Sequence, residues 1–140
     1  MYMEYDIAII GGGPAGYTAA ERASENGLKT ILFEKNAIGG VCLNEGCIPT
    51  KTLLYSAKIL DSIKSASKYG IVAMKDPSFD LAKIIDRKNK TVRKLTLGVK
   101  ARLTGNGVTI VEGEARITGE EFGNIRIHCD GKEYLEALKP

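Results

Sequence analysis

The sequence lacks long apolar runs, has few cysteines and carries little charge excess of either sign. No apolar run approaches about 18 residues, so no transmembrane helix is expected. The net charge of +3, from 20 basic and 17 acidic side chains, is too small to indicate nucleic acid or an anionic membrane as a partner. The basic residues between 87 and 94 are interpreted as a solvated helix face. We therefore expect a chain that binds neither nucleic acid nor a membrane.

Cysteine and histidine are also scarce, with three cysteines and one histidine in 140 residues. The start of the chain, MYMEYDIAIIGGG, does not resemble a signal peptide, so a secreted disulfide framework is not expected. We expect a cytoplasmic protein, in which a disulfide is usually catalytic or regulatory. In the strand pattern IRIHC, alternation places Cys129 on the buried face and His128 in solvent. His128 is therefore not interpreted as a catalytic base.

The patterns that are present predict an α/β fold. Residues 5–35 indicate a strand, a glycine turn, a helix over about 14–26 and a second strand. Two strands joined by a crossover helix form a βαβ unit, which places both strands in a parallel sheet. The continuous apolar run at 7–10 predicts that the first strand is buried on both faces of that sheet.

The rest of the chain predicts two helices and then a meander. Apolar spacing favours helices over about 48–66 and 81–103, with Asp80 as the N-cap of the second. The 48–66 helix has one apolar side. After TGNG the period changes to two, which predicts one more sheet strand and an antiparallel meander with a hairpin turn at Asp130-Gly131. We expect one domain, with a parallel sheet and crossover helices followed by the meander.

A G-x-G-x-x-G motif follows the first strand and opens the first helix. Its members are Gly11, Gly13 and Gly16, which would respectively make the tight turn, admit a pyrophosphate and let helix and strand pack closely. Backbone N–H groups at the helix start can then face phosphates. Glu34, at the end of the second strand, can accept hydrogen bonds from a ribose diol. This pattern predicts a dinucleotide site, the alternative being a glycine-rich turn without a ligand.

Two cysteines lie in the stretch GGVCLNEGCIPTK. A regular helix would hold the Cα atoms of Cys42 and Cys47 roughly 8–9 Å apart, beyond the limit of about 7 Å for a disulfide. The loop must therefore be irregular, and its glycines permit this. Pro49 fits the first turn of the following helix, so Cys47 would lie at a helix N-terminus that favours a thiolate. Lys51, one turn on, could stabilise a thiolate or a charge developing on a cofactor.

Three readings of this pair remain open: a redox disulfide, two inert buried thiols, or half of a metal site. Inert core cysteines are unexpected in a polar, glycine-rich loop, and a zinc site needs four ligands with other spacings. We therefore favour the redox disulfide and expect no metal. A flavin can accept a hydride and pass electrons to a disulfide, so a dinucleotide fold followed closely by two thiols suggests FAD.

The stretches GGGPAGYTAA, LFEK and GGVCLNEGCIPTK resemble the flavoprotein disulfide reductases, the class I pyridine nucleotide-disulfide oxidoreductases, over about residues 5–136. The resemblance implies a Rossmann-like FAD-binding domain in which Cys47 lies next to the flavin, Cys42 attacks the substrate disulfide and Lys51 lies near the flavin N5. The cofactor-binding set that it implies comprises Gly11, Gly13, Pro14, Ala15, Gly16, Glu34, Lys35, Gly40, Val41, Cys42, Cys47, Lys51, Gly113, Glu114 and Ala115. Val41 stands where threonine is common in the family, so one side-chain hydrogen bond to the cofactor would be missing.

Within the family, Leu43 and Ile48 are most similar to the dihydrolipoamide dehydrogenases, whereas glutathione and mercuric reductases more often carry valine at both positions. The resemblance implies oxidation of dihydrolipoyl groups of 2-oxo acid dehydrogenase or glycine cleavage complexes by a homodimeric parent that reduces NAD⁺. Family members are several times longer, so residues 1–140 are expected to be the N-terminal part of an FAD-binding domain, without the NAD and dimer-interface domains and inactive alone. The alternatives are a glutathione- or mercuric-reductase-like enzyme and a non-catalytic dinucleotide-binding or redox-sensor module.

Overall fold

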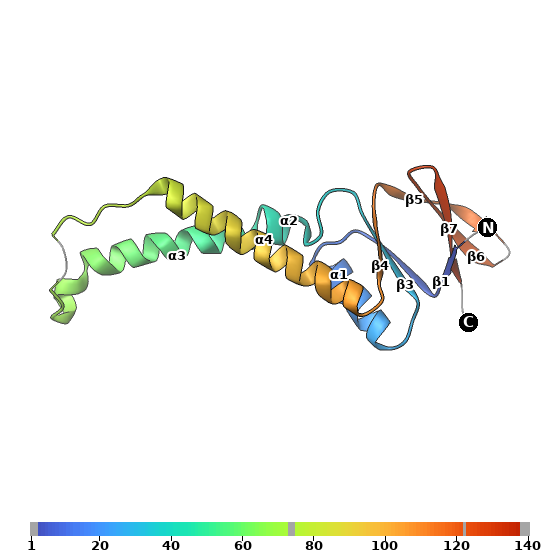
Figure 1. Cartoon of the computed structure of the whole chain (residues 1–140), viewed down its shortest axis with the longest axis horizontal. Helices are drawn as coiled ribbons and strands as arrows, with labels where there is room; N and C mark the ends of the chain where they lie inside the picture. Colours follow the sequence, from blue (N-terminus) through green and yellow to red (C-terminus); the bar gives the residue numbers. More distant parts are fainter. Residues whose placement is uncertain (1–2, 73–74, 122, 138–140) are drawn as a thin grey trace.

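The computed structural model describes residues 3–72, 75–121 and 123–137 (Figure 1). Its strands are β1 (Met3–Tyr5), β2 (Ile7–Ile10), β3 (Thr30–Glu34), β4 (Thr109–Glu112), β5 (Ala115–Glu121), β6 (Asn124–Cys129) and β7 (Lys132–Ala137). Its helices are α1 (Pro14–Glu25), α2 (Gly40–Asn44), α3 (Cys47–Lys64), the 3₁₀ helix η1 (Ala66–Tyr69) and α4 (Leu81–Gly105). Within these ranges no helix combines the length and apolarity that crossing a membrane requires.

The predicted βαβ unit is confirmed. Strands β2, β3 and β4 form a parallel sheet in that order, and α1 connects β2 to β3. All five residues of β3 are buried because this central strand is covered on both faces. The prediction for β2 was wrong in one respect: it is an edge strand, and the Ile10 side chain at its carboxyl end is 49% exposed. An apolar run alone does not distinguish a central strand from an edge strand.

The predicted meander is confirmed as β5, β6 and β7, which pair antiparallel. Asp130 and Gly131 both have positive φ, 46° and 78°, as the tight turn between β6 and β7 requires. The sequence did not predict β1, which pairs parallel to β7 and completes a four-stranded sheet. Phe33 of β3 meets Tyr134 of β7 edge to face, with ring centroids 5.1 Å apart, and so joins the cores of the two sheets.

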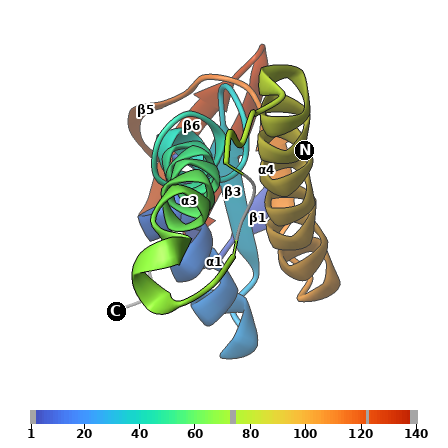
Figure 2. The ribbon, with the colours of Figure 1, turned by 90° about the vertical axis from the view of Figure 1, so that its left-hand side faces the viewer.

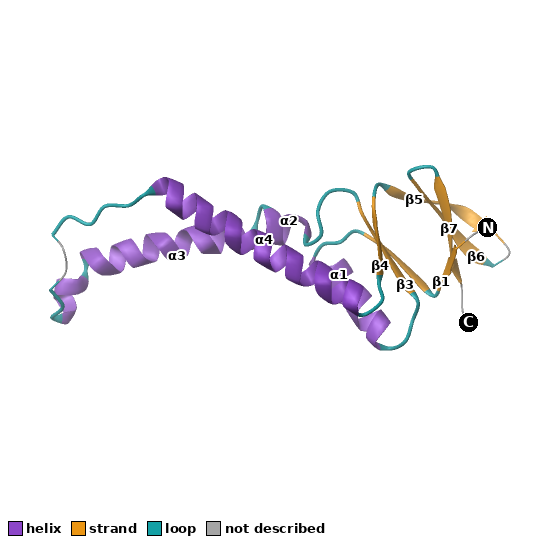
Figure 3. Ribbon diagram, viewed as in Figure 1, coloured by secondary structure: helices purple, strands orange, loops and turns teal. Residues whose placement is uncertain are grey.

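A hairpin of α3 and α4 extends away from the strands, whereas α1 and the C-terminal end of α4 lie beside the parallel sheet (Figure 3). The view along the hairpin shows α3 beside α4 (Figure 2), and the two helices are in contact. Asp80 is the N-cap of α4, as predicted, and its carboxylate accepts from the Lys83 N–H at 3.1 Å. The apolar side predicted for α3 is mostly uncovered within the described residues: Leu54 is 62% exposed and Ile59 46%.

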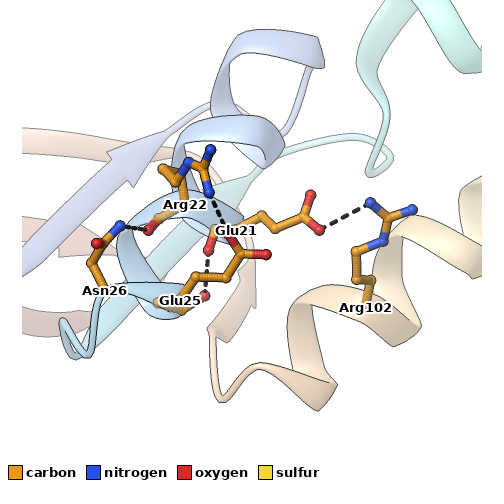
Figure 4. Close-up of polar contacts among 6 residues, drawn as sticks. Glu21, Arg22, Glu25, Asn26 and Arg102 are labelled. Atoms are coloured by element: carbon orange, nitrogen blue, oxygen red, sulfur yellow. Dashed lines mark hydrogen bonds and ion pairs between the residues drawn. The ribbon is translucent and has the colours of Figure 1, made fainter.

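An ion pair joins the two helices that flank the parallel sheet. Arg102 of α4 donates to the Glu21 carboxylate of α1 at 2.9 Å (Figure 4). Beneath it lies a core cluster that includes Ala20, Leu32 and Leu103. The sheet, α1 and the C-terminal half of α4 therefore form one packed unit, which fixes the position of the glycine turn.

Candidate nucleotide and dithiol site

The glycine motif has the geometry that its spacing predicts. Gly11 has φ of +106°, and its N–H donates to the Phe33 carbonyl at 2.8 Å, so the chain turns sharply at the end of β2. A Cβ on Gly16 would lie 1.7 Å from the Gly11 carbonyl oxygen. The first glycine therefore makes the turn, and the third lets α1 approach it closely.

The N-terminus of α1 is open where a phosphate would approach. Gly13 is the N-cap, has no side chain to bond the first helical N–H groups, and would place a Cβ with no atom within 4 Å. A cavity of about 460 Å³ lies here, lined in part by Pro14 and Ala15. Free N–H groups at a helix start favour an anion. This opening is therefore suited to the pyrophosphate of a dinucleotide.

Glu34 is buried beside the glycine turn, where it makes two backbone hydrogen bonds. Its Oε2 accepts from the Gly12 N–H at 2.7 Å and its Oε1 from the Asn36 N–H at 2.7 Å. Each carboxylate oxygen can accept a further bond, so the predicted role toward a ribose is still available. The sequence did not reveal that the same carboxylate also bonds to the Gly12 N–H, because Gly12 is not one of the three glycines that define the motif.

Two further cavities continue the opening along the carboxyl ends of the strands. One of about 230 Å³ is lined by Ile10, Gly11, Phe33, Glu34, Lys35, Gly113, Glu114 and Ala115. The other, of about 450 Å³, is lined by Glu34, Asn36, Ala37, Gly40, Val41, Asn44 and Glu45. Glu34 borders both. The structure thus brings together the predicted residues of the glycine loop, the β3 end and the β4–β5 turn around one connected rim.

The two thiols lie on either side of a helix break. Cys42 is in α2 and Cys47 is the first residue of α3, while Glu45 and Gly46 separate the helices. The Gly46 N–H donates back to the Val41 carbonyl at 2.6 Å, which returns the chain toward Cys42. The predicted irregular loop is therefore present, with Cys47 at a helix N-terminus.

Cys42 and Cys47 are free thiols in the structure and are in contact. The Cys42 thiol donates a hydrogen bond to the Cys47 side chain, which raises the pKa of Cys42. Burial and the charge of a Cys47 thiolate act in the same direction, whereas a hydrogen bond with the Cys47 backbone lowers the pKa. Lys51, an exposed residue one turn beyond Cys47, also opposes the upward shift because its positive charge favours a thiolate at Cys42. Cys42 is half-buried and Cys47 is exposed, so both sulfurs are accessible for exchange.

The glycine turn (residues 11–13) and the loop that carries the two thiols (residues 39–47) are connected by direct contacts. The Gly39 N–H donates to the Gly12 carbonyl at 2.8 Å. Gly40 packs so closely on Gly13 that an added Cβ would lie 2.9 Å from the Gly13 Cα. The Asn44 side chain braces the same turn through hydrogen bonds to the Ile38 and Gly40 carbonyls, a role that the sequence pattern does not indicate.

Residues outside this region do not join it. Cys129 is buried in the core between the two sheets, as predicted. His128 is not simply solvated as expected: its Nδ1 lies 2.9 Å from a Glu133 oxygen, and its Nε2 accepts from the Gly131 N–H at 3.3 Å. The β6–β7 turn creates these partners. Within the described parts of the chain, no cluster of three or more acidic, histidine or cysteine side chains could hold a metal ion.

Comparison with known proteins gives concordant results. The family model described as pyridine nucleotide-disulphide oxidoreductase matches residues 5–134. The chain is 47% identical over 126 residues to the dihydrolipoyl dehydrogenase of Acholeplasma laidlawii, which covers 90% of this chain and 35% of that protein. It is 49% identical over 115 residues to that of Mycoplasma genitalium, covering 82% and 25%. It is 45% identical over 132 residues to that of Bacillus subtilis, covering 94% and 29%.

A solved structure shares the fold. The crystal structure of LpdA from Mycobacterium tuberculosis superposes with a TM-score of 0.78 at 23% identity, over 96% of this chain and 29% of that one. The chain thus spans between a quarter and about a third of the proteins that it matches. Since the family model covers residues 5–134, the chain belongs to the pyridine nucleotide-disulphide oxidoreductase family.

Proposed function

We propose that residues 1–140 are the N-terminal part of the FAD-binding domain of a dihydrolipoyl dehydrogenase. The enzyme would oxidise dihydrolipoyl groups through a Cys42–Cys47 disulfide and FAD and would reduce NAD⁺. The observation that carries the proposal is the position of these two thiols on either side of the break between α2 and α3, in a loop bonded directly to the glycine turn through Gly39 and Gly12. Relatives at 45–49% identity with this name support the choice within the family.

The residues present fit FAD. The uncapped start of α1 at Gly13 would hold the pyrophosphate, the Glu34 carboxylate the adenosine ribose, and the backbone at 113–115 the adenine. The dithiol loop would border the isoalloxazine ring. When bound, the flavin supplies two-electron chemistry that links a dithiol to a nicotinamide.

The chain's own residues account for the exchange with substrate. A dihydrolipoyl group would reduce the Cys42–Cys47 disulfide: its two S–H groups become one S–S bond, and the protein disulfide becomes two thiols. Cys42 would form the mixed disulfide with the substrate, and Cys47 would lie next to the cofactor. Lys51 would stabilise negative charge on this side of α3, as its effect on the Cys42 pKa indicates. Because Gly13 has no side chain, the pyrophosphate of the cofactor could approach the main chain closely there.

We further propose a homodimeric, cytoplasmic enzyme that serves lipoyl groups of a 2-oxo acid dehydrogenase or glycine cleavage complex, and we propose no nucleic-acid or membrane partner. The names of the relatives support the lipoyl substrate. The chain spans 25% to 35% of these relatives. We therefore assign nicotinamide binding and the dimer contacts to the parts of the relatives that this chain does not match.

A chimaera tests the proposal. This chain would replace the aligned segment of the Bacillus subtilis relative, to which it is 45% identical. We expect the chimaera to hold FAD and to form NADH from dihydrolipoamide, and we expect the Cys42→Ser and Cys47→Ser versions to hold FAD without forming NADH. Turnover only with glutathione disulfide or mercuric ion would assign a different reductase. A folded chimaera that binds FAD but never forms the disulfide would instead favour a non-catalytic module.

A further inference from the structure

The Asn44 side chain connects the two ends of the short helix that carries Cys42. Its Nδ2 donates to the Gly40 carbonyl at 2.9 Å and to the Ile38 carbonyl at 3.1 Å. Asn44 is the last residue of α2, whereas these carbonyls belong to the turn that precedes it and to its first residue. A single amide group makes both hydrogen bonds, so one side chain connects the C-terminal end of α2 to its N-terminal end and to the turn before it.

The turn that Asn44 braces is conformationally demanding. Gly39 and Gly40 both have positive φ, 99° and 56°, a conformation that glycine adopts readily but that nothing in an unfolded chain selects. Helix α2 has only five residues and no side-chain N-cap, so its own hydrogen bonds do not fix it strongly. The Asn44 amide supplies the missing side-chain constraint.

This turn also sets the position of the dithiol against the dinucleotide loop. Gly39 donates to the Gly12 carbonyl, and Gly40 packs on Gly13. On its other side, α2 leads through the Glu45–Gly46 break to Cys47. Asn44 lies between these two connections, so its bonds affect both the approach of Cys42 to Cys47 and the approach of the pair to the cofactor rim.

We propose that Asn44 is a positioning residue for the redox pair. By holding the reduced loop in the arrangement that the disulfide needs, it lowers the conformational entropy lost when the sulfur–sulfur bond forms. The disulfide is therefore harder to reduce than it would be in an unbraced loop. This inference rests on the proposed redox role of Cys42 and Cys47.

The test measures the thiol–disulfide equilibrium of the 140-residue chain in glutathione buffers. Oxidation joins the Cys42 and Cys47 sulfurs, releases both thiol hydrogens and converts one glutathione disulfide into two glutathione thiols. Asn44→Ala removes both donors, and Asn44→Asp keeps the shape while placing a carboxylate against two carbonyls. The matched control is Asn89→Ala, because Asn89 is an exposed residue of α4 whose side chain makes no hydrogen bond within the described residues.

We expect both Asn44 variants to shift the equilibrium toward the dithiol by about tenfold, within the range of net stabilisation that the two lost hydrogen bonds provide, and Asn89→Ala to leave it unchanged. Urea unfolding of the reduced chains separates this from loss of fold, since a purely structural role would lower the urea midpoint and leave the equilibrium of the folded chain unaltered. That second pattern, or a shift equal to that of Asn89→Ala, would overturn the proposal. If the unsubstituted 140-residue chain formed no Cys42–Cys47 disulfide, that result would contradict the proposed function and not the role of Asn44.

Discussion

Two glycines of the same motif are predicted to respond oppositely to the same added methyl group. A Cβ on Gly16 would lie 1.7 Å from the Gly11 carbonyl oxygen, about 1.6–1.9 Å closer than an ordinary carbon–oxygen contact. The obstacle is backbone, and α1 and the β2 turn would both have to move. Overpacking usually costs about 1–3 kcal/mol, so we expect Gly16→Ala to reach the upper end or exceed it, a large share of a typical domain stability of about 5–15 kcal/mol.

Gly13→Ala is the matched control for stability. Its Cβ would meet no atom within 4 Å, and its φ of −73° suits any residue. Loss of the favourable N-cap glycine and the reduced entropy of the unfolded chain nearly offset each other, so we expect a change within about 0.5 kcal/mol. The same methyl group would project into the opening where we propose that the pyrophosphate binds, and we expect at least a tenfold loss of FAD affinity.

Urea unfolding followed by circular dichroism gives the first comparison, and FAD fluorescence quenching gives the second. We expect Gly16→Ala to unfold at a much lower urea concentration than Gly13→Ala. Equal midpoints for the two variants would refute it, because the 1.7 Å contact would then not describe the packing of α1 on the glycine turn.

Two further predictions concern single side chains. Asp80→Ala removes the N-cap of α4 and should cost about 1 kcal/mol in urea unfolding, whereas Asp61→Ala, which removes an exposed carboxylate without such a bond on α3, should cost little; equal losses would contradict the capping role. Lys51→Gln removes the positive charge that favours a Cys42 thiolate, so the pKa of Cys42, already raised by its hydrogen bond with the second thiol, should rise further. Iodoacetamide labelling of Cys42, followed by peptide mass spectrometry, should then require higher pH, while Lys58→Gln should leave the labelling profile unchanged; no difference between the two variants would remove Lys51 from the site.

Local spacing was sufficient to predict the first half of the site. The βαβ unit follows from apolar runs and a glycine motif only a few residues apart, and the roles of Gly11 and Gly16 depend on backbone geometry that the motif itself specifies. The irregular dithiol loop was also predictable, because a regular helix keeps residues five apart too far from each other for a disulfide.

The contacts that connect the two halves could not be predicted from spacing. The hydrogen bond between Glu34 and Gly12 and the two hydrogen bonds donated by Asn44 depend on how the chain folds back at residues 38–40, where Gly39 and Gly40 have positive φ angles. The exposure of the apolar side of α3 was also not predictable, because periodicity identifies an apolar face but does not indicate what covers it. The edge position of β2 depends on the order of strands in the sheet.

Peptide mapping after mild oxidation shows whether the two loop thiols pair with each other. The 140-residue chain would be treated with glutathione disulfide, its remaining thiols alkylated, and its peptides analysed by mass spectrometry without reductant. We expect one crosslink, between Cys42 and Cys47, with Cys129 unmodified until the chain is unfolded because it is buried. Separate glutathione adducts on the two loop cysteines, with no crosslink between them, would contradict it.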